Sequence, residues 1–161
     1  MAEHDDKTLT ELEPPHSIAQ ASVDDKGRLK LPAEFAEYLE KTGVTKVFAT
    51  TVDFRTVRLY PLALWKRNEN LFDSAGENSA AAERLARLAK SYGSDADIKD
   101  GRVLLPATLR TEMGLEKQAV YVDAYGGRIN VVSKKIHDEL LQVARASLAE
   151  DLKTLEKLGF K

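Results

Sequence analysis

The residues of this sequence that are best placed to do chemistry are two arginines, each preceded by a glycine. Arg28 lies in the stretch Val-Asp-Asp-Lys-Gly-Arg-Leu-Lys-Leu-Pro, and Arg102 lies in Asp-Ile-Lys-Asp-Gly-Arg-Val-Leu-Leu-Pro. Glycine after a polar residue suits a tight turn because it tolerates positive φ, and the arginine then begins an apolar-rich strand. A guanidinium at the tip of such a hairpin can bind a phosphate or a guanine edge. The alternative is an exposed arginine that only pairs with a neighbouring aspartate, an interaction worth little.

This pattern occurs twice at a constant offset, which indicates a tandem duplication. The glycine, the arginine and the proline of the second copy each lie 74 residues after their counterparts, from Gly27 to Gly101 and from Pro32 to Pro106. In both copies a short helical pattern follows, and proline suits the first helical position because its missing N–H needs no partner there. A repeat of this kind makes the two arginines a pair to be considered together.

The elements that must position these arginines can be read from turn signals and hydrophobic spacing. We expect a hairpin over 17–31, a helix over 32–42, strands over 44–52 and 54–60, and a helix that opens at Pro61. Trp65 on that helix has the spacing of a core or interface residue. A linker over 74–79 is followed by a helix over 80–92, which we expect Ser79 to cap. The second unit should repeat the order: a hairpin over 95–105, a helix over 106–113, strands over 118–124 and 128–132 joined by Gly126-Gly127, and a long helix over 134–158.

Composition restricts the classes of function. The chain has 161 residues, 43% of them hydrophobic and 31% charged, and it contains no cysteine, so disulfides and thiol chemistry are excluded. No stretch has the length of a membrane span, no secretory signal is visible, and we expect a cytoplasmic protein. Residues 1–16 are acidic and have a net charge of −4. Because the whole chain has a net charge of −2, the remaining residues have a net charge of +2. A nucleic-acid surface would therefore be a local patch, multiplied by self-association.

Signatures of enzymes and cofactor sites are missing. The histidines, His4, His16 and His137, have no metal-ligand spacing, and no phosphate-binding loop, dinucleotide fingerprint or nucleophile elbow is present. Asp24 and Asp25 are adjacent on an expected strand and would point to opposite faces, which makes them a poor catalytic pair. The sequence therefore does not favour an enzyme. It also gives no reason to expect a cofactor, a metal ion or a small-molecule substrate.

With its two Gly-Arg copies separated by a helical connector, the chain resembles the MraZ family of bacterial transcriptional regulators over roughly 17–140. The stretch from Lys99 to Val131 also looks like the AbrB swapped-hairpin domain, and Tyr60-Pro61-Leu62 followed by Trp65 looks like the MraZ segment that enters the connector. The resemblance implies an α+β fold: two AbrB-like swapped-hairpin units packed as a pseudo-dimeric β-barrel, with short helices and a long C-terminal helix. It also implies ring-like homo-oligomers that bind short tandem DNA repeats ahead of the division and cell-wall gene cluster.

The resemblance assigns DNA contacts to both hairpin tips. The family's Asp-x-x-x-Arg motif falls on Asp24 and Arg28, Arg102 matches in the second unit, and Arg110 matches an AbrB-type arginine after the proline. The expected DNA-binding residues are Lys26, Arg28 and Lys30 at the first tip and Lys99, Arg102 and Arg110 at the second, with Asp24, Gly27 and Gly101 in support. Asp24 would orient Arg28, since a carboxylate beside phosphate is repelled. Two positions depart from the pattern: Ile98 stands where the second aspartate would be, and Ala36 stands at the first-unit equivalent of Arg110.

These observations lead to two hypotheses for the function of the protein. The first is a nucleoid-associated regulator that binds double-stranded DNA. The alternative is an antitoxin-type module that holds a protein partner through the acidic tail. The expected segments are the tail 1–16, a first unit 17–73, a linker and connecting helix 74–93, a second unit 94–133 and a C-terminal helix 134–161.

Overall fold

The eight strands of the chain close into one antiparallel barrel. A computed structural model describes residues 13–161, so almost all of the acidic tail predicted over 1–16 lies outside the described residues. The strands are β1 (Ala19–Val23), β2 (Arg28–Lys30), β3 (Lys46–Thr50), β4 (Val57–Pro61), β5 (Ser94–Lys99), β6 (Arg102–Leu104), β7 (Ala119–Tyr125) and β8 (Arg128–Ser133). With the six α-helices of the described chain, the barrel confirms the predicted α+β class.

Hairpins from the two repeats alternate around this barrel. The strand order is β1-β2-β6-β5-β3-β4-β8-β7, and β7 closes the circle by pairing with β1. Each hairpin of one repeat is therefore flanked on both sides by strands of the other repeat. Because no strand of either repeat can complete its ladder without the other, the two repeats form a single interlocked structure.

The barrel interior is filled by the inward side chains of these strands. Along β2 only the central residue, Leu29, faces inward, and its partner in β6 is Val103; both are fully buried. This alternation is that of a sheet with one apolar face and one face toward solvent. The outward residues of β2 and β6 are thus free to carry function.

Short helices plug the barrel after each Gly-Arg hairpin. Helix α2 (Ala33–Lys41) buries Phe35 and Leu39, and α5 (Ala107–Met113) buries Leu109. Each helix begins one residue later than predicted, because the preceding proline occupies the N-cap with an extended backbone rather than the first helical position. Gly114 ends α5 in the left-handed conformation, as expected of a C-terminal glycine.

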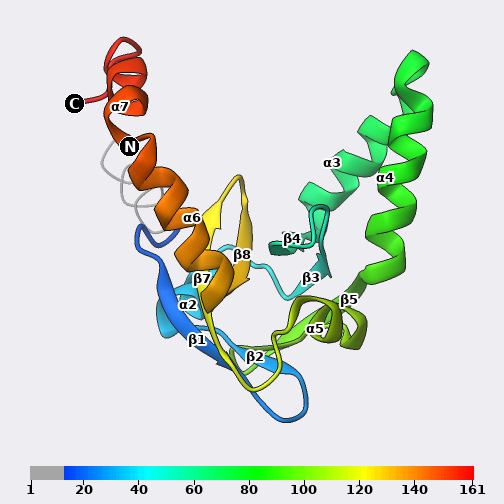
Figure 1. The fold of residues 1–161 in the computed structure, drawn as a ribbon. Coiled ribbons are helices and arrows are strands. Elements are labelled where there is room, and N and C mark those ends of the chain that lie inside the picture. Colours follow the sequence, from blue (N-terminus) through cyan, green and yellow to red (C-terminus); the bar gives the residue numbers. More distant parts are fainter. Residues whose placement is uncertain (1–12) are drawn as a thin grey trace, which may run out of the picture.

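Two helical arms extend from the barrel (Figure 1). The first is formed by α3 (Leu62–Asp73), the 3-10 turn η1 (Gly76–Asn78) and α4 (Ser79–Tyr92). Trp65 is buried between Phe48 and Tyr60 at ring-centroid distances of 4.7 and 5.0 Å, which confirms its predicted packing role. The prediction that Ser79 caps α4 is wrong: the 3-10 turn leads directly into the helix, so Ser79 is already helical, and Asn78 occupies the N-cap without a side-chain hydrogen bond.

The second arm is the C-terminal segment, where one long helix was predicted and two short ones are found. Helices α6 (Lys134–Ala146) and α7 (Leu148–Glu156) meet at Ser147, a weak helix former. Ser133 caps α6 by accepting a hydrogen bond from the N–H of Ile136. The large apolar residues exposed along this arm are Leu140, Leu141, Val143, Leu148, Leu152, Leu155, Leu158 and Phe160. Within residues 13–161, no helix combines the length and apolarity that crossing a membrane requires.

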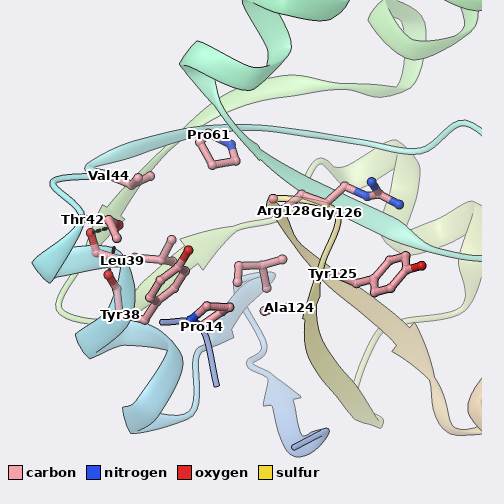
Figure 2. Close-up of a pocket in the computed structure, with 12 residues that line it drawn as sticks. Pro14, Tyr38, Leu39, Thr42, Val44, Pro61, Ala124, Tyr125, Gly126 and Arg128 are labelled. Atoms are coloured by element: carbon pink, nitrogen blue, oxygen red, sulfur yellow. Dashed lines mark hydrogen bonds between the residues drawn. The ribbon is translucent and has the colours of Figure 1, made fainter. Parts of the chain in front are cut away.

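A cavity of about 290 Å³ lies between α2 and the β7–β8 hairpin (Figure 2). Tyr38 and Leu39 line it on the helix side, and the Gly126-Gly127 turn lines it on the hairpin side. The hydroxyl of Thr42 already donates to the carbonyl oxygens of Tyr38 and Leu39. Figure 2 also shows the Arg128 side chain directed away from the cavity. This cavity therefore offers apolar contact rather than chemistry.

Candidate nucleic-acid interface

The first hairpin tip is organised by a single carboxylate. Asp24 Oδ1 accepts the backbone N–H groups of Lys26 and Arg28, both at 2.9 Å, and Asp24 Oδ2 accepts Nε–H of Arg28 at 2.9 Å. Gly27 closes the turn with φ of 83°, a value that glycine adopts without strain. In Figure 1 this turn lies at the end of the barrel opposite the two arms. Hydrogen bonds within residues 24–28 therefore define the shape of this turn.

The ion pair between Asp24 and Arg28 leaves part of the guanidinium available. The side chain of Arg28 is 47% exposed, and only its Nε is engaged by the carboxylate. Across the described part of the chain, the two terminal nitrogens of Arg28 have no hydrogen-bond partner. Pairing with the neighbouring aspartate and orienting the arginine toward a partner are thus compatible in this geometry.

Hydrogen bonding also sets the charge state of this carboxylate. The backbone N–H of Arg28, more than any other group, holds the pKa of Asp24 below its ordinary value of 3.8, and the Arg28 guanidinium adds to this effect. A depressed folded-state pKa means that the interaction is fully present above the ordinary value and is lost as the pH falls through the lower one. The tip should therefore be intact at neutral pH.

Replacing Asp24 separates its two contributions. Asp24→Asn keeps an oxygen for the two backbone N–H groups but removes the charge that orients Arg28, whereas Asp24→Ala removes both. At pH 7 we expect amide exchange at Arg28 to be slowest in the wild type, faster in Asp24→Asn and fastest in Asp24→Ala. An NMR titration of the Asp24 carboxyl carbon should give a midpoint below that of a solvated aspartate; a midpoint at or above it would contradict this description of the tip.

The second tip has a different turn. Asp100 and Gly101 have φ of 50° and 70°, as in a two-residue type I′ turn, and Lys99 pairs directly with Arg102 across it. Ile98 occupies the position equivalent to Asp24, so no carboxylate caps this tip. Arg102 is half-buried, and it has no ion pair or side-chain hydrogen bond among residues 13–161.

The two tips lie side by side because β2 pairs with β6. Arg28 is opposite Leu104, and Lys30 is opposite Arg102. Two further bonds join the tips reciprocally: Leu31 donates its N–H to the Gly101 carbonyl at 2.8 Å, and Leu105 donates to the Gly27 carbonyl at 3.0 Å. Like charges placed opposite each other on a sheet destabilise it. The Lys30–Arg102 pair is therefore a feature that an anionic ligand would stabilise.

A groove of about 790 Å³ runs beside the tips and brings four of the six predicted residues together. Arg28, Lys99, Arg102 and Arg110 line this groove, together with Asp95, Asp97 and Asp100. Lys26 and Lys30 are exposed but do not line it. The acidic residues limit the positive potential, so the surface suits a few specific contacts more than bulk attraction of a polyanion.

Arg110 differs from the other predicted cations because it is largely buried. Its side chain is 16% exposed, its Nε donates to the Leu105 carbonyl at 3.2 Å, and its Nη1 lies 3.5 Å from Glu116 Oε1. Its guanidinium also lies against Gly27, where an added Cβ would collide with it. The sequence did not indicate these contacts, because Glu116 and Gly27 are far from one another along the chain.

Sequence reasoning also missed a polar network on the outer face of β4 and β8. Arg58 Nη1 donates to the Tyr60 hydroxyl at 2.8 Å, and Arg128 Nε donates to Asn130 Oδ1 at 3.0 Å. Burial raises the pKa of nearby Asp123, although Asn130 partly offsets this. The Arg-x-Tyr and Arg-x-Asn alternation at 58–60 and 128–130 was the available signal. The network leaves one buried nitrogen, Nε of Arg58, without a hydrogen-bond partner among the described residues. It lies on strands away from β2 and β6.

The other basic candidate is the exposed face of α4, with Arg84, Arg87 and Lys90. None of these side chains lines the groove beside the tips. Within the described residues, no group of three or more His, Cys, Asp or Glu side chains could hold a metal ion. The tips thus remain the surface where the predicted residues converge.

Two interlocked Gly-Arg repeats with adjacent basic tips define a protein of the swapped-hairpin barrel class. Comparison with known proteins gives the family. The chain is 30% identical to the Transcriptional regulator MraZ of Thiobacillus denitrificans over 145 residues, which span 89% of this chain and 96% of the relative. It is 38% identical to the protein of the same name from a Marinomonas species, over 63% of this chain and 68% of the relative. It is 34% identical to that of Tolumonas auensis, over 66% and 70% of the two chains.

The chain therefore belongs to the MraZ family of transcriptional regulators, as the repeat pattern predicted. No protein-family model matches the chain. The names of these relatives describe regulators of transcription and no enzymatic activity.

Proposed function

We propose that this chain is a sequence-specific DNA-binding regulator whose two adjacent tips contact double-stranded DNA. The observation that carries the proposal is the β2–β6 pairing, which sets Arg28, Lys30 and Arg102 on one outward face. Two cations opposite each other on neighbouring strands repel each other, and an anionic partner would offset this repulsion. The membership in a family of transcriptional regulators supports DNA as that partner.

The lysines of the two tips contribute affinity, and the arginines contribute specificity. Lys26, Lys30 and Lys99 neutralise phosphates, because an ammonium is a point charge without directional preference. Arg28 and Arg102 read base edges, since a guanidinium can bind a guanine through two parallel hydrogen bonds. Asp24 holds Nε of Arg28 and so presents the remaining nitrogens in one orientation.

A single chain offers few cations, so we propose that affinity comes from repetition. Ring-like homo-oligomers, which the resemblance to the MraZ family implies, would place several tip pairs against short tandem repeats and gain avidity without new contacts. The exposed apolar residues of α6 and α7 support self-association, because a large exposed apolar surface marks an interaction site. We propose that the repeats lie ahead of the division and cell-wall gene cluster and that the protein acts at the nucleoid in the cytoplasm.

The test is fluorescence-polarisation titration of the full chain with the DNA upstream of its own gene and with a scrambled copy, at several salt concentrations. We expect preference for the upstream DNA and a log–log salt slope of about −0.9 per phosphate neutralised, hence about −2.7 per bound chain for the three lysines. Equal, weak binding to both DNAs would overturn the proposal. A protein partner co-purified through the acidic N-terminal residues would then support the antitoxin-type alternative.

A further inference from the structure

We propose that Arg110 is a positioning residue: it belongs to the second repeat, and it braces the first hairpin tip instead of contacting DNA. This inference rests on the proposed function for its meaning, since a braced tip matters only if the tip binds. The sequence led us to expect a direct DNA contact from Arg110, but its side chain is largely buried.

The brace is a short chain of contacts through Leu105. The Leu105 N–H donates to the Gly27 carbonyl at 3.0 Å, and the Leu105 carbonyl accepts Nε–H of Arg110 at 3.2 Å. The guanidinium that makes this bond also lies against Gly27 itself. The Gly27 carbonyl is thus held by the Leu105 peptide group, and the Gly27 Cα is covered by the Arg110 side chain. Both residues belong to the other repeat.

Glu116 fixes the far side of the same guanidinium. Its Oε1 lies 3.5 Å from Nη1 of Arg110, while Nε is engaged by Leu105. Only Nη2 of Arg110 has no partner among residues 13–161, and the side chain is 16% exposed, so little of the guanidinium is left for a phosphate or a base. A planar guanidinium that is held on two edges moves little, so it restricts the motion of the turn that it covers.

The repeat supplies an internal comparison, because the equivalent positions on the other tip lack the brace. Leu31 donates to the Gly101 carbonyl at 2.8 Å, which mirrors the Leu105 bond. At the position of Arg110, however, the first repeat has Ala36, whose Cβ would be only in ordinary contact with a Cβ at Gly101. The position of Glu116 is taken by Thr42, whose hydroxyl is bonded within α2.

Two independent differences therefore point the same way. The first tip has the Asp24 cap and the Arg110 brace, whereas the second has Ile98 and Ala36 at those positions. We infer that the first tip is preorganised for its partner and that the second tip orders on contact. Preorganisation lowers the entropy lost on binding, so the braced tip should contribute more to specific affinity.

The experiment combines amide exchange on the free chain with DNA titration of the same variants. In Arg110→Ala we expect exchange at the Leu105 and Arg28 amides to accelerate about tenfold or more, while the Leu31 amide at the other tip changes less than about twofold. Specific DNA binding should weaken with an unchanged salt slope, because no phosphate contact is lost. Arg110→Lys should behave like Arg110→Ala, since an ammonium keeps the charge but not the two-edged contact.

Lys99→Ala is the matched control, because Lys99 lines the same groove and is exposed. It should leave exchange at Leu105 unchanged and make the salt slope shallower by about 0.9. If Arg110→Lys restores binding, and Arg110→Ala makes the slope shallower without faster exchange, Arg110 is a direct phosphate contact and the inference is overturned.

A graft covers the case in which Arg110→Ala fails to fold. The double variant Ala36→Arg with Thr42→Glu places the brace at the equivalent positions of the first repeat, against the second tip. Slower exchange at the Leu31 amide is expected, and unchanged exchange in a folded graft would overturn the inference. Because exchange is measured without DNA, absence of specific DNA binding by the wild type would count against the proposed function alone.

Discussion

Arg28→Ala should abolish the preference for upstream DNA while the barrel remains folded. One bidentate arginine–guanine contact is worth about 1–3 kcal/mol of discrimination, or roughly 5- to 150-fold for each chain. In an oligomer on repeated sites, the loss would be multiplied across the bound tips. Folding should be preserved because the side chain is exposed and its ion pair with Asp24 is a surface interaction. Polarisation titrations against upstream and scrambled DNA measure both the affinity and the preference.

Arg55→Ala is the control for this variant. Arg55 is also exposed to nearly the same degree, 48% against 47%, and its Nη2 lies 3.2 Å from Glu139 Oε2, so it is likewise an ion-paired surface arginine. It lies in the loop between β3 and β4 rather than at a Gly-Arg tip. Binding should be close to wild type in Arg55→Ala. Retention of upstream preference by Arg28→Ala would remove Arg28 from the site.

Leu29→Ala should produce the largest loss of stability, about 2–5 kcal/mol. Leu29 is fully buried in the barrel, where it pairs with Val103 of the other repeat, and truncation leaves a cavity that rigid strands cannot fill. Such a loss is a large part of the roughly 5–15 kcal/mol that stabilises a typical domain. Urea unfolding at a fixed protein concentration, followed by circular dichroism and by the single tryptophan, Trp65, measures the change.

The same experiment tests whether the repeats fold as one unit. Because hairpins of the two repeats alternate around the barrel, both probes should report one transition that shifts as a whole. Leu104→Ala, on the neighbouring strand but 53% exposed, should cost no more than about 0.5 kcal/mol. Two separate transitions, only one of them shifted by Leu29→Ala, would contradict the interlocked barrel.

Local sequence signals predicted the fold well where they decide it. The 74-residue offset indicated a tandem duplication, and the resemblance to the MraZ family implied that the two copies form a barrel. Gly126-Gly127 indicated the turn between β7 and β8, where both glycines have positive φ. The predictions that failed concern positions whose structure is decided by residues outside the local sequence window. Ser79 is not a cap because a 3-10 turn runs into α4, and the long C-terminal helix divides at Ser147.

The candidate site was predictable in its residues but not in its arrangement. Arg28 and Arg102 were found from the repeat, yet their adjacency depends on β2–β6 pairing between segments far apart in the chain. Arg110 matched a family pattern for DNA contact, whereas its contacts with Leu105 and Glu116 exist only in the folded barrel. Spacing in a sequence identifies side chains capable of chemistry; packing decides which of them remain available.

Site-directed cross-linking tests whether DNA binds at the first tip. The chain has no cysteine, so Lys26→Cys places a single photo-cross-linker beside Arg28, and Arg87→Cys places one on the exposed face of α4. Each full-length variant would be irradiated with upstream and with scrambled DNA. We expect cross-linking to upstream DNA from position 26 and little from position 87. Cross-linking from position 87 but not from position 26 would contradict DNA binding at the first tip.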